Sequence, residues 1–101
     1  MLTRYGFREL RTAGGTLEAY LVPLPDGGCE WRDISGRLVA IITPDGVHRD
    51  ISGRQIGYYL DQGGYIEVRD TGGVLVGYIE KSTGDYRDAG GRLIGYFTKG
   101  W

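Results

Sequence analysis

The stretch RDISGRQIGYY, residues 49–59, closely repeats the stretch RDISGRLVAII, residues 32–42. Related phrases are RTAGGTLEAYL at 11–21, RDTGGVLVGYI at 69–79 and RDAGGRLIGYF at 87–97. The five phrases start at 11, 32, 49, 69 and 87, so the spacings are 21, 17, 20 and 18 residues. Self-similarity of this kind indicates one supersecondary unit that is repeated along the chain.

Each unit carries the signals of a β-hairpin. In the pattern D-x-x-G, the Asp side chain accepts hydrogen bonds from nearby backbone amides, and the Gly adopts a positive φ. The pattern predicts a type I turn closed by a G1-bulge glycine, at Gly15, Gly36, Gly53, Gly73 and Gly91. Return turns are predicted at 25–28, 44–46, 61–64 and 81–84. The short runs between turns, rich in Val, Ile and Tyr, predict about ten antiparallel strands and no helix.

Alternation within a unit predicts which residues share a face of the strand. After the tip turn, Leu38, Ala40 and Ile42 should lie on one face, and Val39 and Ile41 on the other. Both faces are largely apolar, so we expect neither to be fully solvated. The centre of the first face is small in every unit, which predicts close approach by a neighbouring backbone or ring; these residues are Ala19, Ala40, Gly57, Gly77 and Gly95.

The two ends of the chain favour closure of the repeats into a ring. The segment GFRELR (6–11) looks like a strand that lacks its predecessor, and TKGW (98–101) looks like a return turn that lacks its successor. Joined in space, they would complete the fifth unit. We therefore expect one all-β domain over residues 1–101, in which five repeated hairpins form an antiparallel meander closed into a ring. The alternative is an open row of hairpins with capping ends.

The strand pattern G-x-[IL]-G-Y-[IF] after R-D-x-x-G resembles the β-flower proteins of bacteria, in which four or five hairpin petals surround an axis. The resemblance is carried by GRQIGYY (53–59), GVLVGYI (73–79) and GRLIGYF (91–97), and it covers the chain from about residue 7 onward. The first unit departs from the pattern, because Thr12 replaces Asp and Glu18–Ala19 replaces Ile–Gly. This departure leaves the number of petals at four or five. The resemblance implies a fold, and it implies no catalytic residues.

Composition limits the class of protein. The chain has 101 residues and a formal charge of −1, so bulk charge does not favour nucleic-acid binding. Cys29 is the single cysteine, which excludes an internal disulfide and fits a reducing compartment. The start MLTRYGFREL lacks the apolar run of a signal peptide, and no stretch is apolar enough to span a membrane. We expect a soluble cytoplasmic protein of a bacterium or phage, with leaderless export or a virion location left open.

Arginine is the residue type that most suggests a site. Arg11, Arg32, Arg49, Arg69 and Arg87 open the five units, and Arg37, Arg54 and Arg92 follow three of the tip glycines. These eight arginines face four turn aspartates, a local surplus of +4, whereas the opposite turns carry four aspartates and two lysines, a surplus of −2. One hypothesis is that an arginine rim binds an anion, with repeated tyrosines stacking on a nucleotide-like ring. The other is that each arginine pairs with its turn Asp, or with the acid two positions before it, and covers a tyrosine.

The candidate ligand-binding residues of the first hypothesis are Arg32, Arg37, Arg49, Arg54, Arg69, Arg87, Arg92, Tyr58, Tyr78 and Tyr96. Trp31 and Trp101 are expected to pack between the hairpins. Cys29 and His48 are the only candidates for catalysis; His48 occupies a slot that other units fill with Leu10, Trp31, Val68 or Tyr86, which predicts a packed histidine. No metal site, cofactor or phosphate-binding motif is expected.

These patterns favour a non-enzymatic interaction module that binds an unidentified protein partner. The alternative is a protein that binds or sequesters a small anionic ligand, such as a nucleotide signal, through the arginine rim. An enzyme that uses Cys29 or His48 is the third hypothesis. Self-association by stacking of rings also stays open, because the two rims differ in charge.

Overall fold

The computed structural model describes residues 1–100, so Trp101 and its expected packing lie outside the described part. A short 3-10 helix, η1 (Leu2–Tyr5), precedes ten strands. The strands are β1 (Phe7–Thr12), β2 (Leu17–Pro23), β3 (Cys29–Arg32), β4 (Leu38–Ile42), β5 (Val47–Asp50), β6 (Gln55–Asp61), β7 (Tyr65–Arg69), β8 (Leu75–Glu80), β9 (Asp85–Asp88) and β10 (Leu93–Lys99). Each strand pairs with both neighbours, in a closed antiparallel barrel. The expected all-β meander is therefore confirmed.

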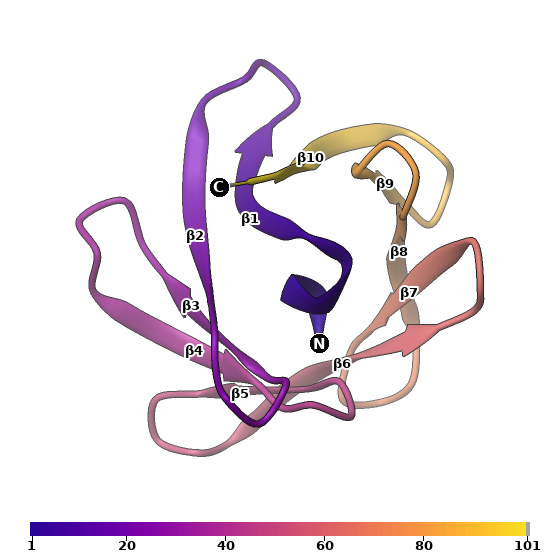
Figure 1. Cartoon of the computed structure of the whole chain (residues 1–101). Helices are drawn as coiled ribbons and strands as arrows, with labels where there is room; N and C mark the ends of the chain where they lie inside the picture. Colours follow the sequence, from indigo (N-terminus) through magenta and orange to yellow (C-terminus); the bar gives the residue numbers. More distant parts are fainter. Residues whose placement is uncertain (101) are drawn as a thin grey trace.

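Five hairpins project outward around the barrel axis (Figure 1). We call them petals 1 to 5, formed by β1–β2, β3–β4, β5–β6, β7–β8 and β9–β10. In petal 3, Gly53 donates its N–H to the Asp50 carbonyl (2.9 Å), and Asp50 donates its N–H to the Arg54 carbonyl (2.9 Å). The Asp50 side chain accepts the N–H groups of Ser52 and Arg54, both at 3.0 Å, and Gly53 has a φ of 89°. The predicted turn chemistry is therefore present at the tip.

Petal 1 is a complete hairpin although its turn lacks an Asp. The Thr12 hydroxyl oxygen accepts the N–H of Thr16 at 3.1 Å, which is the bond that the Asp side chain accepts in the other petals. The Thr12 carbonyl still accepts the N–H of Gly15 at 2.9 Å. The question left open by the sequence is thus answered: the barrel has five petals.

A β-bulge interrupts the second strand of every petal. In petal 3, His48 pairs with Gly57 and Arg49 pairs with Gln55, so Ile56 between them has no partner. The same register shift leaves out Glu18, Val39, Val76 and Ile94 in the other petals. A bulge places an extra residue against one partner and disturbs strict alternation. The expected simple division of each strand into two faces is therefore wrong at this position.

Two layers of side chains fill the barrel, one nearest η1 and one nearer the petal tips. The layer nearest η1 contains one large residue from the second strand of each petal, all at most 5% exposed: Leu21, Ile42, Tyr59, Ile79 and Phe97. Next to it the small residues bring the petals together. A Cβ on Gly57 would lie 2.9 Å from the Arg69 carbonyl oxygen, and one on Gly95 would lie 2.7 Å from that of Arg11. The predicted close approach of a neighbouring backbone is confirmed at these glycines.

Closure of the ring depends on β1, which lies between β2 and β10. Phe7 is the partner of Lys99 in the β1–β10 pair, and Gly100 donates its N–H to the Gly6 carbonyl at 3.0 Å. The two ends of the chain therefore close the ring, as expected, and the open row of hairpins is excluded. They do so as the junction between petals 5 and 1, because each of these petals is complete by itself. The resulting molecule is a disc of 31 × 30 × 21 Å.

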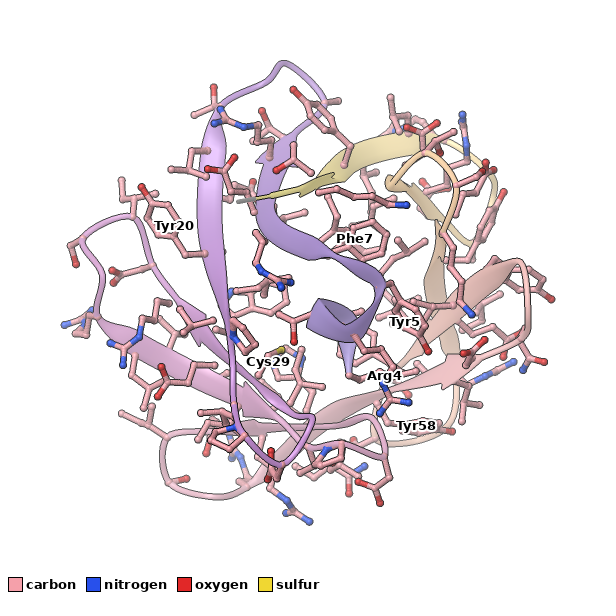
Figure 2. The ribbon with its side chains drawn as sticks, viewed as in Figure 1. Arg4, Tyr5, Phe7, Tyr20, Cys29 and Tyr58 are labelled. Carbon is pink, nitrogen blue, oxygen red and sulfur yellow. The ribbon has the colours of Figure 1, made fainter. Side chains whose placement is uncertain are left out.

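The helix η1 fills one end of the barrel, and the expectation of no helix is wrong there. Figure 2 shows Phe7 and Cys29 close to η1 inside the ring, whereas Tyr20 lies outside it between petals 1 and 2. Met1, Leu2 and Thr3 are buried, and the Met1 amino group donates to the carbonyls of Gly27 (3.0 Å) and Thr43 (3.4 Å). Return turns thus supply the acceptors for this segment.

A first prediction concerns the close approach of petals 4 and 5. A Cβ on Gly77 would overlap the Arg87 carbonyl oxygen and lie 3.0 Å from Cε1 of Tyr86. We expect Gly77→Ala to lower the free energy of unfolding by about 1–3 kcal/mol, because overpacking forces the backbone to shift. The control is Gly64→Ala, where a Cβ meets nothing within 4 Å and φ is not positive. Urea unfolding checks the pair, and equal stability of the two variants would contradict the prediction.

Candidate functional site

At four of the five junctions between petals, the first arginine of a unit lies beside a tyrosine of the neighbouring petal. Tyr58 is the cross-strand partner of Arg69, and Tyr78 is the partner of Arg87. The junctions of β10 with β1 and of β2 with β3 have the same arrangement, and Ile41 replaces the tyrosine beside Arg49. The first arginines and the tyrosines therefore recur around the ring at the junctions, whereas Arg37, Arg54 and Arg92 lie at petal tips, and the structure does not gather the candidate residues into a single pocket.

The first arginine of each unit holds its own petal tip. Its Nη1 donates to the carbonyl of the tip glycine at 2.8 to 3.1 Å in all five petals. Four of these arginines also form ion pairs with the acid two positions earlier, namely Glu9, Glu30, Glu67 and Asp85. The surplus of +4 counted only the turn aspartates. Glu9, Glu30 and Glu67 reduce it to +1, and Asp85, which the count assigned to the opposite turns, pairs with Arg87. The bonds match the second of the two arginine hypotheses.

The candidate tyrosines reach across to the next petal. The hydroxyl of Tyr58 lies 3.4 Å from the position that a Cβ would take on Gly73, and the hydroxyl of Tyr96 lies 3.3 Å from that position on Gly15. Tyr78 approaches Gly91 in the same way, at 3.7 Å. A tyrosine ring thus fills the space between neighbouring petals, which accounts for its repetition.

The second arginines are far more available to a partner. The side chains of Arg37, Arg54 and Arg92 are 80 to 83% exposed, and their Nε atoms lie 3.5 to 3.9 Å from the turn carboxylates. Exposed pairs of this length contribute little to stability. Arg49 differs from the other first arginines, because it forms no carboxylate ion pair within residues 1–100 and Val47 occupies the position of the acid.

A hollow of about 300 Å³ lies among the inner side chains on the side of the petal tips, away from η1. We call it the barrel mouth. Its lining includes one inner residue from the first strand of each petal: Leu10, Trp31, His48, Val68 and Tyr86. The bulge residues Ile56 and Val76 also line it, and Val39 and Ile94 occupy the equivalent bulges. These four apolar side chains are 37 to 43% exposed. Four of the five units have an apolar residue at the bulge, so the sequence contained a signal for the mouth. The sequence alone could not place these residues there, because their position depends on the register between the strands.

His48 is packed inside this mouth. Its Nδ1 is hydrogen-bonded to the Tyr59 hydroxyl at 3.1 Å, and its ring lies 5.3 Å from Trp31 and 5.6 Å from Tyr59 between centroids. Burial lowers the pKa of His48 from its ordinary value of 6.5 and raises the pKa of the Tyr59 hydroxyl. The expected packed histidine is found, and it is neutral at pH 7.

Cys29 and His48 do not form a nucleophile–base pair. Cys29 on β3 and His48 on β5 are both cross-strand partners of Ile42 on β4, so they lie two strand spacings apart, about 10 Å. Cys29 is fully buried, and burial raises the pKa of its thiol. A buried thiol of this kind is a poor nucleophile.

Comparison of the chain with protein-family models, with curated proteins and with solved structures yields no match. Over residues 1–100, no three His, Cys, Asp or Glu side chains gather in a way that could hold a metal ion. The same part of the chain has no helix of the length and apolar character that a bilayer crossing needs. The geometry of this chain alone therefore supports the functional argument.

A second prediction follows from the buried histidine. Because the pKa of His48 is lower in the folded state, the unfolded chain binds more protons between the two values. The free energy of unfolding should therefore fall as the pH drops below 6.5, and His48→Gln should flatten the profile in that window. Asp33 and Asp50, whose pKa values are lowered by bonds to Ser35 and Ser52, lose their contribution only below pH 3.8. Urea unfolding at several pH values checks this, and parallel profiles near pH 6 would contradict it.

Proposed function

We propose that the protein is a non-enzymatic interaction module that binds a segment of a partner protein at the barrel mouth. The observation that carries the proposal is the pair of half-exposed apolar bulge residues, Ile56 and Val76, that line the mouth together with aromatic side chains. Val39 and Ile94 hold the equivalent bulge positions in two other petals and are exposed to a similar degree. Contiguous exposed apolar surface of this kind is typical of interaction sites. On the pattern of its petals, we also propose that the chain is related to the β-flower proteins.

Charge around the mouth favours an acidic partner segment. Arg37, Arg54 and Arg92 each precede a bulge residue by two positions, and each is largely exposed. An apolar side chain of the partner would enter the mouth, while flanking carboxylates would meet the arginines. Pairing of a buried apolar anchor with a charged rim is the usual arrangement of such interfaces.

A third prediction tests this proposal with a displayed peptide library. Selection on the wild-type chain should enrich peptides with a large apolar residue flanked by Asp or Glu. The double variant Ile56→Asn/Val76→Asn should lose affinity for these peptides by about tenfold or more, because two apolar contacts are removed. The control is Ile34→Asn/Val74→Asn, which changes two exposed apolar residues at petal tips outside the mouth. Enriched peptides that bind both double variants equally would contradict the proposal.

Arg49 favours a second candidate, the binding of a small anion such as a nucleotide. Among the arginines that open the five units, Arg49 is the one whose guanidinium group has no carboxylate within ion-pair distance among the described residues. Arg54 lies in the same petal. Guanidinium groups match phosphate geometry well.

A fourth prediction separates this candidate from the first. If an anion binds, nucleotides or polyphosphate at ~100 times the dissociation constant should add about 2.7 kcal/mol of stability, measured by thermal melting. The variant Arg49→Ala/Arg54→Ala should lose this gain, and Arg92→Ala should keep it. A panel of anions that shifts no melting temperature would remove the candidate.

A further inference from the structure

A second hollow, a groove of about 560 Å³, lies on petal 4. Its lining includes Tyr65 and Glu67 of β7 and Leu75, Tyr78 and Glu80 of β8. Tyr65 is the cross-strand partner of Glu80, and Glu67 is the partner of Tyr78. The two tyrosines and the two glutamates therefore occupy opposite diagonals of one patch on the hairpin, which we call the petal-4 groove.

The repeat does not require this arrangement. The residues at the position of Tyr65 in the other units are Phe7, Gly28, Asp45 and Thr83, and those at the position of Glu80 are Val22, Thr43, Leu60 and Thr98. Tyr78 recurs as a contact between petals, but its companions Tyr65 and Glu80 are found in petal 4 alone. The side chain of Tyr65 is exposed, and its ring contacts that of Tyr78. Tyr65 thus has no evident role in holding the ring together, and Glu80 contributes only a long ion pair to Arg87 of petal 5, at 3.8 Å.

The rings form a corner. The centroids of Tyr65 and Tyr78 are 6.1 Å apart, and their planes meet at 73°. Two rings at this angle surround a compact group on two sides, whereas a flat base or sugar needs one open ring face. Aromatic faces attract cations, and the attraction increases when water is excluded.

Carboxylates dominate the charge of the petal-4 groove. Arg69 neutralises Glu67 through an ion pair of 3.0 Å. The side chain of Glu80 is 41% exposed, and its nearest basic partner is Arg87, at 3.8 Å. Lys81 follows Glu80 in the chain but turns to Asp61, at 2.6 Å, and to the ring of Tyr5 near η1. Glu80 therefore has the longer and weaker of the two ion pairs that the carboxylates of the groove form.

We propose that the petal-4 groove binds an organic cation, an alkylammonium or guanidinium group, held by the rings of Tyr65 and Tyr78 and by the carboxylate of Glu80. The volume lies within the range of small-molecule sites, about 300–1,000 Å³. The cation is supplied either by a free small molecule or by a basic side chain of a peptide. This site is separate from the barrel mouth and does not rest on the function proposed for it.

The test uses the full chain and three probes followed by amide chemical shifts. The probes are choline, its neutral analogue in which a tert-butyl group replaces the trimethylammonium group, and an uncharged-ended tripeptide with a central arginine. Choline or the peptide should shift the amides of petal 4 and bind at least about tenfold more tightly than the neutral analogue. If choline alone binds, the cation is that of a free small molecule; if the peptide alone binds, the cation is a basic side chain. Binding of the neutral analogue as tight as that of the cation that binds, or no shift with either cation, overturns the proposal.

Two variants and two controls locate the site. Tyr65→Leu and Glu80→Gln should each weaken binding of the cation by about fivefold. Tyr20 is the residue of petal 1 that corresponds to Tyr78, and petal 1 has Phe7 and Val22 at the positions of Tyr65 and Glu80. Tyr20→Leu should therefore leave binding unchanged. Ile56→Asn/Val76→Asn in the mouth should also leave it unchanged, so failure of the mouth proposal and failure of this one give different results. Unaltered binding in both groove variants overturns the proposal even if cations bind elsewhere.

Discussion

The structure depends on one constraint, the closure of the first strand against the last. Because β1 pairs with both β2 and β10, the sheet has no free edge, and every petal has two neighbours. Closure around so small a ring requires the backbones of adjacent petals to approach closely, which Gly57, Gly77 and Gly95 permit. The ring also leaves an axial space, and the segment around η1 fills it at one end with Met1 and Leu2. The other end stays open as the barrel mouth.

The repeat separates structural residues from residues that are free to bind. What recurs in every petal holds the ring: the tip glycine, the arginine that donates to its carbonyl, and in four junctions the tyrosine beside the next arginine. An anion-binding rim would need the guanidinium groups of the first arginines as donors. In four petals these groups already donate to the carbonyl of the tip glycine and to a carboxylate. Residues that depart from the repeat, such as Tyr65, Glu80 and Arg49, have fewer of these bonds and are better candidates for recognition.

Much of the fold could be predicted because its determinants are local. The Asp50–Gly53 turn uses bonds within five residues, and the small residue at Gly57 is visible in the sequence itself. The helix η1 could not be predicted, because four residues show no periodicity and their burial follows from the barrel around them. The mouth and the petal-4 groove could not be predicted either. Ile56 enters the mouth only through a register shift between strands, and Tyr65 meets Tyr78 only through the pairing of β7 with β8.

The two hollows are linked through one ion pair. Arg69 lines the barrel mouth, and its partner Glu67 lines the petal-4 groove. The Glu67 carboxylate holds the guanidinium group at 3.0 Å, while Arg69 also donates to the Gly73 carbonyl at the tip. Because Arg69 occupies Glu67 at this short distance, the carboxylate of the groove with the weaker ion pair is that of Glu80. The ion pair that helps to hold the tip of petal 4 thus has one member at each hollow, so neither residue can turn to a ligand without loosening the tip.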